Sequence, residues 1–301
     1  MKNCFLLLFI VSCLTLQSCA DLQHVNSFSN TAVKTIKSYD DIGYNFTTSY
    51  YNYTQGQNAY QLPGNIDRNS IGLPTPLVVA NEPQTANNAD KAINFYITSI
   101  ASYFEGLAEL SDKDLVNYNF DELSNNLKAD QNLKTKLGIN SDDQIDAGAK
   151  IATVFTNELM GAYRERKIRR VMIDYDSAVG KSIQTLIDIL TNAILPSIRN
   201  DGGLVDVKYQ LILKNPKVEL STKAELVNSY NEEKIKLDKF RTQIEDLIKA
   251  LASIKDEHSK TAILLRDRKL TAKDVRDLIN QHGAEVYQLY TSIKNLTTKS
   301  N

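Results

Sequence analysis

Two long runs of apolar residues at helical spacing most constrain what this chain can fold into. The first run covers residues 142–198 and contains no proline before Pro196, and the second covers residues 221–266. In both runs apolar residues recur at steps of three and four, which is the period of one helix face. At 1.5 Å per residue, such helices would be about 85 and 70 Å long. The sequence therefore predicts two very long helices that pair antiparallel as a hairpin over residues 142–266. The first exceeds the diameter of a compact domain, so a bend or break at Gly161 or Gly180 is the alternative.

The short segment between these runs allows two conformations. Residues 200–203 read Asn-Asp-Gly-Gly, residue types that often stop a helix. After them, Val207, Tyr209, Leu211 and Leu213 alternate with polar residues, a pattern typical of a strand. The sequence thus predicts a hairpin tip within residues 199–220. It leaves open whether the tip carries a small β-ribbon or continues the helices.

The N-terminal part of the chain contains a helical pattern and then an irregular segment. Apolar residues at helical spacing predict a helix within residues 19–54, with Gly43 as its weak point. Four of the six prolines fall between Pro63 and Pro83. Because proline interrupts helices, residues 55–87 are expected to form an irregular strap.

Further helical patterns place residues 88–301 in one helical bundle. One stripe has steps of alternately four and three residues, typical of a packed seam: Ala89, Ile93, Tyr96, Ile100, Tyr103, Leu107 and Leu110. Ser141 and Gln144 form a capping box that opens the first long run. The predicted fold class is therefore all-α, an elongated antiparallel helical bundle built on the long αα-hairpin.

Composition excludes several classes of function. The chain has 35 basic and 36 acidic residues, and its net charge of -1 gives no electrostatic footprint for nucleic acid. Nucleic acid is therefore not an expected partner. The three cysteines are Cys4, Cys13 and Cys19, so the rest of the chain offers no thiol for a nucleophile or a metal site.

The N-terminus has the layout of an export signal. Lys2 supplies a positive start, and an apolar stretch of about a dozen residues follows from Phe5 to Leu16. Leu16-Gln17-Ser18-Cys19 resembles the lipobox of bacterial lipoproteins, with Leu three positions before the Cys and a small residue directly before it. The resemblance implies that residues 1–18 are removed and that Cys19 carries lipid. It implies a lipid-anchored protein of the bacterial cell envelope, with the outer membrane as the expected location and the exposed face left open.

The first long run carries charges where apolar residues are expected. Arg166 and Arg169 occupy seam positions, and Asp176 follows Arg169 by one heptad. A desolvated arginine needs a partner. If the hairpin turns near residue 210, Arg166 lies level with residues 254–258, and Glu257 becomes a candidate partner. These four residues therefore predict either a polar layer that sets helix register or a site for an anionic ligand.

No known catalytic or metal-binding motif stands out in the sequence. The three histidines, His24, His258 and His282, lack the spacing of metal-ligand pairs, and no phosphate-binding or nucleophile loop is present. We therefore expect no catalytic residues, metal or cofactor. Shape favours a non-enzymatic binding or scaffolding protein whose hairpin reaches a protein partner in the envelope. The alternatives are a membrane-active protein of the pore-forming type and an enzyme with a site in a bundle cleft near Arg166.

Overall fold

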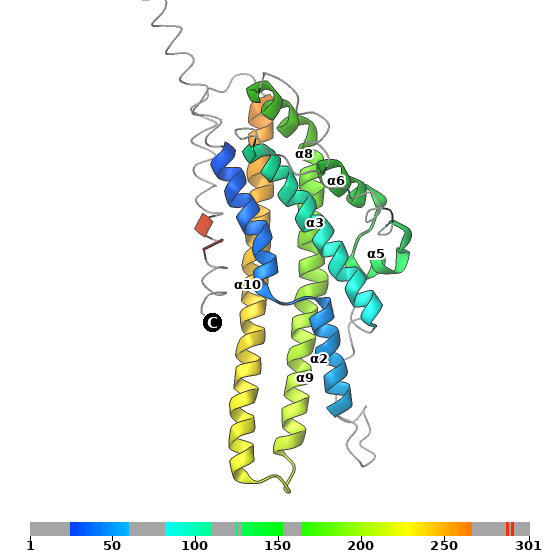
Figure 1. Cartoon of the computed structure of the whole chain (residues 1–301), viewed down its shortest axis with the longest axis vertical. Coiled ribbons are helices and arrows are strands. Elements are labelled where there is room, and N and C mark those ends of the chain that lie inside the picture. Colours follow the sequence, from blue (N-terminus) through cyan, green and yellow to red (C-terminus); the bar gives the residue numbers. More distant parts are fainter. Residues whose placement is uncertain are drawn as a thin grey trace, which may run out of the picture.

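The chain folds as a bundle of α-helices. The computed structural model describes residues 25–59, 82–109, 125, 128–152, 164–266, 287–288 and 290–291, and this part contains no strand. Two long helical arms run antiparallel along the length of the molecule, and the other helices pack around them, leaving one end of the hairpin bare (Figure 1). The predicted all-α, elongated bundle on a long hairpin is confirmed.

The hairpin consists of two continuous helical arms. The first arm is made of α8 (Arg164–Ile189), the π-helical turn η2 (Leu190–Ile194) and α9 (Leu195–Leu213). The second arm is α10 (Leu220–Arg266), whose 47 residues extend about 70 Å at 1.5 Å per residue. This second long helix matches the prediction. A turn over residues 214–219 joins the arms.

The π-helical turn lies directly before Pro196, the second residue of α9. Proline has no N–H and its ring clashes with the preceding turn of a regular α-helix. A locally wider turn accommodates the ring, and π-turns commonly occur as such single insertions. The first arm can therefore continue through the proline.

The prediction of one unbroken helix over residues 142–198 is wrong. The alternative break at Gly161 falls among residues 153–163, outside the described part, whereas α8 continues through Gly180. Helix α6 (Asp142–Ala152) instead packs antiparallel against α8. Ile145 and Ile151 of α6 are buried. An 85 Å helix would have left much of this apolar surface in water, whereas folding back buries it against the same arm. Gln144 accepts the backbone N–H of Ser141 at 3.2 Å, which is one of the two hydrogen bonds of the predicted capping box at the start of α6.

The helix stop at Gly202–Gly203 and the alternative of a β-ribbon are also wrong. Both glycines lie inside α9, which continues to Leu213. Each glycine costs a helix about 1 kcal/mol relative to alanine. Packing of Leu204 and Tyr209, which are both buried, offsets this cost. The hairpin therefore turns later than residue 210, and every pairing between the arms shifts accordingly.

The N-terminal helical pattern forms two helices that are separated at Gly43. A helix covers residues 25–42, and α2 (Phe46–Ala59) follows it. Gly43 has φ of +72°, a conformation that favours glycine. Asn45 caps α2 by accepting the backbone N–H of Thr48 at 2.7 Å. The predicted weak point is thus confirmed as a helix break.

Helix α3 (Pro83–Glu109) begins four residues before the expected end of the strap at residue 87. Proline is favoured in the first turn of a helix, because the N–H that it lacks would have no partner there. Residues 55–59 likewise belong to α2, and residues 60–81 lie outside the described part. The short helix α5 (Gln131–Leu137), capped by Asp130 and ended by Gly138, had no counterpart among the predicted elements.

The apolar core lies where residues 25–42, α3, α6, α8 and α10 meet. Six members of the predicted α3 stripe are at most 1% exposed: Ala89, Ile93, Tyr96, Ile100, Tyr103 and Leu107. The stripe of α10 is buried from Phe240 to His258, but Leu226, Tyr230 and Leu237 are only half-buried. The bundle therefore covers only the second half of α10. The first half pairs mainly with α9 and projects (Figure 1).

Candidate functional site

Asp201 of α9 forms the centre of a buried polar cluster. Its side chain is 2% exposed and accepts hydrogen bonds from three side chains of the residue 44–52 segment. The donors are Tyr44 Oη, Ser49 Oγ and Asn52 Nδ2, each at 2.9 Å. One carboxylate thereby fastens the start of α2 to the first arm of the hairpin.

Burial raises the pKa of Asp201 to about 6, although the three hydrogen bonds act in the opposite direction. Burial also raises the pKa of Tyr44, and the nearby Asp201 carboxylate adds to that effect. Hence Tyr44 is a proton donor to Asp201 at neutral pH. The cluster holds one ionisable carboxyl whose charge changes in the physiological range.

The local sequence explains why these donors meet. The break at Gly43 turns the chain, and Asp90 of α3 then accepts the backbone N–H groups of Phe46 and Thr47 at 2.8 and 3.0 Å. These bonds satisfy N–H groups that a helix start leaves open. They set where α2 begins, and Ser49 and Asn52 fall three residues apart on the same helix face.

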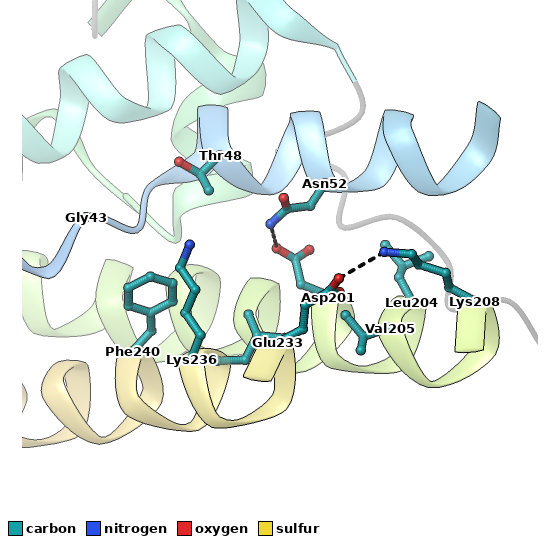
Figure 2. Close-up of a pocket in the computed structure, with 11 residues that line it drawn as sticks. Gly43, Thr48, Asn52, Asp201, Leu204, Val205, Lys208, Glu233, Lys236 and Phe240 are labelled. Atoms are coloured by element: carbon teal, nitrogen blue, oxygen red, sulfur yellow. Dashed lines mark hydrogen bonds and ion pairs between the residues drawn. The ribbon is translucent and has the colours of Figure 1, made fainter. Parts of the chain in front are cut away.

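A pocket of about 380 Å³ opens beside Asp201, between α2, α9 and α10 (Figure 2). Its apolar lining consists of Leu204, Val205, Leu237 and Phe240. Its polar lining consists of Thr48, Asn52, Asp201, Lys208, Glu233 and Lys236, with Gly43 at one edge. The volume lies at the small end of the range for ligand sites, and the mixture of apolar walls with a few polar groups is typical of them.

The charged groups around the pocket differ in how they are partnered. Lys208 and Glu233 form an ion pair with Nζ and Oε1 3.0 Å apart. Lys236 lies 5.6 Å from the centroid of the Phe240 ring. In Figure 2 its amine is directed across the pocket, toward the segment that carries Gly43 and Thr48. The pocket thus combines a neutralised pair with one lysine that faces an open space.

A second polar cluster lies in the bundled half of the molecule. It includes the predicted residue Asp176 and His258, the neighbour of the predicted Glu257. His258 Nε2 is 2.7 Å from Tyr103 Oη, and His258 Nδ1 is 3.1 Å from Asp176 Oδ1. Ser259 Oγ also donates to Asp176, at 3.4 Å. The hydrogen bond from His258 is the main reason why the pKa of Asp176 is lowered. This cluster fixes α3, α8 and α10 relative to one another.

The other predicted residues lie around this cluster without joining one site. Arg169 donates from Nη2 to the carbonyl oxygen of Leu265 at 2.5 Å. Glu257 is fully buried and accepts from Thr261 Oγ1 at 3.3 Å. Arg169 therefore lies level with a residue well beyond Glu257, because the turn comes later than residue 210. The side chain of Arg166 and all of Cys19 lie outside the described part.

The Asp201 cluster was not predicted from the sequence. Asp201 stands in the Asn-Asp-Gly-Gly segment, which favoured a helix stop, and its three donors lie about 150 residues earlier in the chain. No spacing rule connects such distant residues. The one available signal was an unusually Tyr- and Asn-rich stretch around residues 44–53.

Within the described ranges, no group of three or more His, Cys, Asp or Glu side chains could hold a metal ion. No helix in those ranges is long and apolar enough to cross a membrane. No family model, curated protein or solved structure matches this chain.

Proposed function

We propose that the protein is a non-enzymatic binding or scaffolding protein of the bacterial cell envelope. Lipid on Cys19 holds it to the membrane, with the outer membrane as the expected location. The bare end of the hairpin, made of residues 204–237 of α9 and α10, binds a protein partner at a distance from that anchor.

The observation that carries this proposal is the exposure of the side chains at the bare end. From residue 210 to residue 239 no side chain is buried, although the segment forms two paired helices and their turn. Three large apolar side chains of α10 are exposed there: Leu220 by 84%, Val227 by 41% and Ile235 by 68%. They are spaced seven and eight residues apart and therefore share one face of α10. An exposed apolar face on a projecting element is typical of an interaction surface.

The position of the N-terminal helix supports a tether at the other end. The helix over residues 25–42 starts in the half of the molecule away from the hairpin turn (Figure 1). Phe28 contacts Phe104, whose ring lies 6.0 Å from that of His258. From Leu220 to His258, α10 rises about 60 Å. Cys19 precedes the helix by a few residues, so an anchor there would leave the bare end free to reach outward.

Photo-crosslinking in the native envelope tests this proposal. A photoreactive phenylalanine analogue at Leu220 or Val227 should yield a discrete protein adduct, because both side chains are exposed at the bare end. The same analogue at Ile263, which is 54% exposed but lies in the bundled half, is the matched control.

Adducts of equal yield from all three positions, or none from the bare end, would refute a dedicated docking surface there. Cys19→Ser should abolish the adduct formed in cells by removing the tether. An undiminished adduct in that variant would contradict the role of the anchor. Dye leakage from liposomes exposed to the protein would instead favour the pore-forming alternative.

A further inference from the structure

The pocket between α2, α9 and α10 combines apolar walls with charged side chains, and the proposed docking role does not explain this combination. Its walls at Leu204, Val205 and Leu237 are apolar, and Phe240 closes one end. Leu204 and Phe240 are largely buried beneath this opening. Such walls favour a ligand with an apolar body, because contact with them removes apolar surface from water.

The two acidic and two basic side chains that line the pocket differ in their partners. Lys208 and Glu233 neutralise each other through their ion pair. Asp201 directs both carboxylate oxygens to the donors Tyr44, Ser49 and Asn52, and only 2% of the residue is exposed. Its hydrogen-bonding capacity is therefore taken up by the protein itself and not directed into the pocket.

Lys236 has no carboxylate within 4.0 Å of its amine among the described residues, and the amine lies 5.6 Å from the centroid of the Phe240 ring. The Lys236 side chain is exposed. The amine is directed across the pocket rather than away from it (Figure 2). Thr48 and Asn52 line the pocket beside it and offer a hydroxyl and an amide.

We propose that this pocket binds a small amphiphile with one anionic head group, a carboxylate or a phosphate monoester, and a short apolar body. The head group accepts a hydrogen bond from the Lys236 ammonium. The body lies on Leu204, Val205 and Leu237 and against the ring of Phe240. The site adjoins the proposed docking surface and shares residues 204–208 and 233–237 with it, but it is formed where α2 crosses the hairpin and not at the exposed turn over residues 214–219.

Isothermal titration calorimetry of the purified full chain with 4-phenylbutyrate and octanoate tests the site. Both probes should bind with a stoichiometry of one. The amine analogue 4-phenylbutylamine, with the same apolar body and the opposite charge, should bind at least tenfold more weakly. Octyl phosphate distinguishes the two head groups, and inorganic phosphate tests whether charge alone suffices.

Two variants test whether the probes bind in this pocket. Lys236→Gln should weaken binding of 4-phenylbutyrate roughly tenfold or more, which is the effect of losing one charge-assisted hydrogen bond. Val205→Phe, at a half-buried wall position, should abolish binding by filling the pocket. Lys260→Gln, at an exposed lysine of the same helix outside the pocket, is the matched control and should bind normally. Circular dichroism melts verify that each variant is folded.

The proposal is overturned if neither carboxylate binds, or if the amine binds as tightly as the carboxylates. It is also overturned if Lys236→Gln and Val205→Phe, both folded, bind like the unmodified chain. If inorganic phosphate binds as tightly as the carboxylates, the apolar walls contribute nothing to binding, and the proposal is likewise refuted.

Discussion

Asp206 of α9 and Glu233 of α10 hold the bare end of the hairpin together by reciprocal contacts. Each carboxylate accepts hydrogen bonds from one tyrosine and one lysine of the opposite helix. The donors are Tyr209 (2.9 Å) and Lys208 (3.0 Å) for Glu233, and Tyr230 (2.8 Å) and Lys234 (3.2 Å) for Asp206. The two tyrosine rings meet edge to face, with centroids 5.4 Å apart. Polar pairing thus supports two helices that have little apolar core between them.

Glu233→Gln should loosen this end of the hairpin. The substitution removes the charge from two hydrogen bonds, and because the pair is more than one-third exposed we expect a loss of only about 0.5–1 kcal/mol. Hydrogen exchange should rise selectively within residues 204–237. Glu232→Gln, at the adjacent exposed carboxylate, is the control. An equal rise in both variants would show that the reciprocal contacts do not stabilise the hairpin.

Asp201 should make the protein less stable as pH rises through the range of about 4 to 6. The native carboxyl retains its proton up to a pKa of about 6, whereas the unfolded one releases it near 3.9. Between these values the native state binds more protons, so the free energy of unfolding falls with rising pH, by about 3 kcal/mol over the full range.

Asp201→Asn isolates this effect, because an amide does not titrate and can still accept hydrogen bonds. Urea unfolding of both proteins between pH 4 and pH 7 measures the difference. The difference between their free energies of unfolding should shift in favour of the variant as pH rises. A constant difference would contradict a raised pKa at Asp201.

Asp176 should have the opposite dependence. Its pKa is lowered, mainly by the hydrogen bond from His258, so its contribution to stability is present above the ordinary aspartate pKa and is lost as pH falls below about 4. Asp176→Asn should therefore lower the midpoint of urea unfolding at pH 7 and have a much smaller effect near pH 3. Asp174→Asn, which removes an exposed carboxylate two residues away, should change little at either pH.

Substitution by alanine should change stability in opposite directions at two glycines. A Cβ at Gly148 would lie 2.7 Å from Cε1 of Phe95, a buried ring that cannot move freely, so Gly148→Ala should destabilise the junction of α6 and α3 by about 1–3 kcal/mol. A Cβ at Gly180 would meet nothing within 4 Å. Gly180→Ala should therefore stabilise α8 by about 0.5–1 kcal/mol. Thermal melts of the two variants that shift in the same direction would contradict this difference.

Helical periodicity was enough to predict the elements whose apolar face is continuous. The α3 stripe from Ala89 to Leu107 and the second arm from residue 221 to Arg266 were predicted closely, because burial of such a face determines both the helix and its orientation. Gly43 was predicted as a weak point because glycine has a low helix propensity, and the structure breaks the helix there with φ of +72°. The lipobox at Cys19 is a local motif, and it stays a prediction.

Tertiary packing decided what periodicity leaves open. The same pattern fits one straight helix and two helices folded back on each other, and burial of Ile145 and Ile151 where α6 packs on α3 and α8 selected the second. Gly202 and Gly203 favour a helix stop in isolation, but packing of α9 along α10 outweighs that local preference. The meeting of Asp201 with Tyr44 likewise depends on chain segments about 150 residues apart. An all-helical chain with a long hairpin follows from helical periodicity alone. The position of the hairpin turn and the polar groups around the pocket follow from burial between distant segments, which no local pattern encodes.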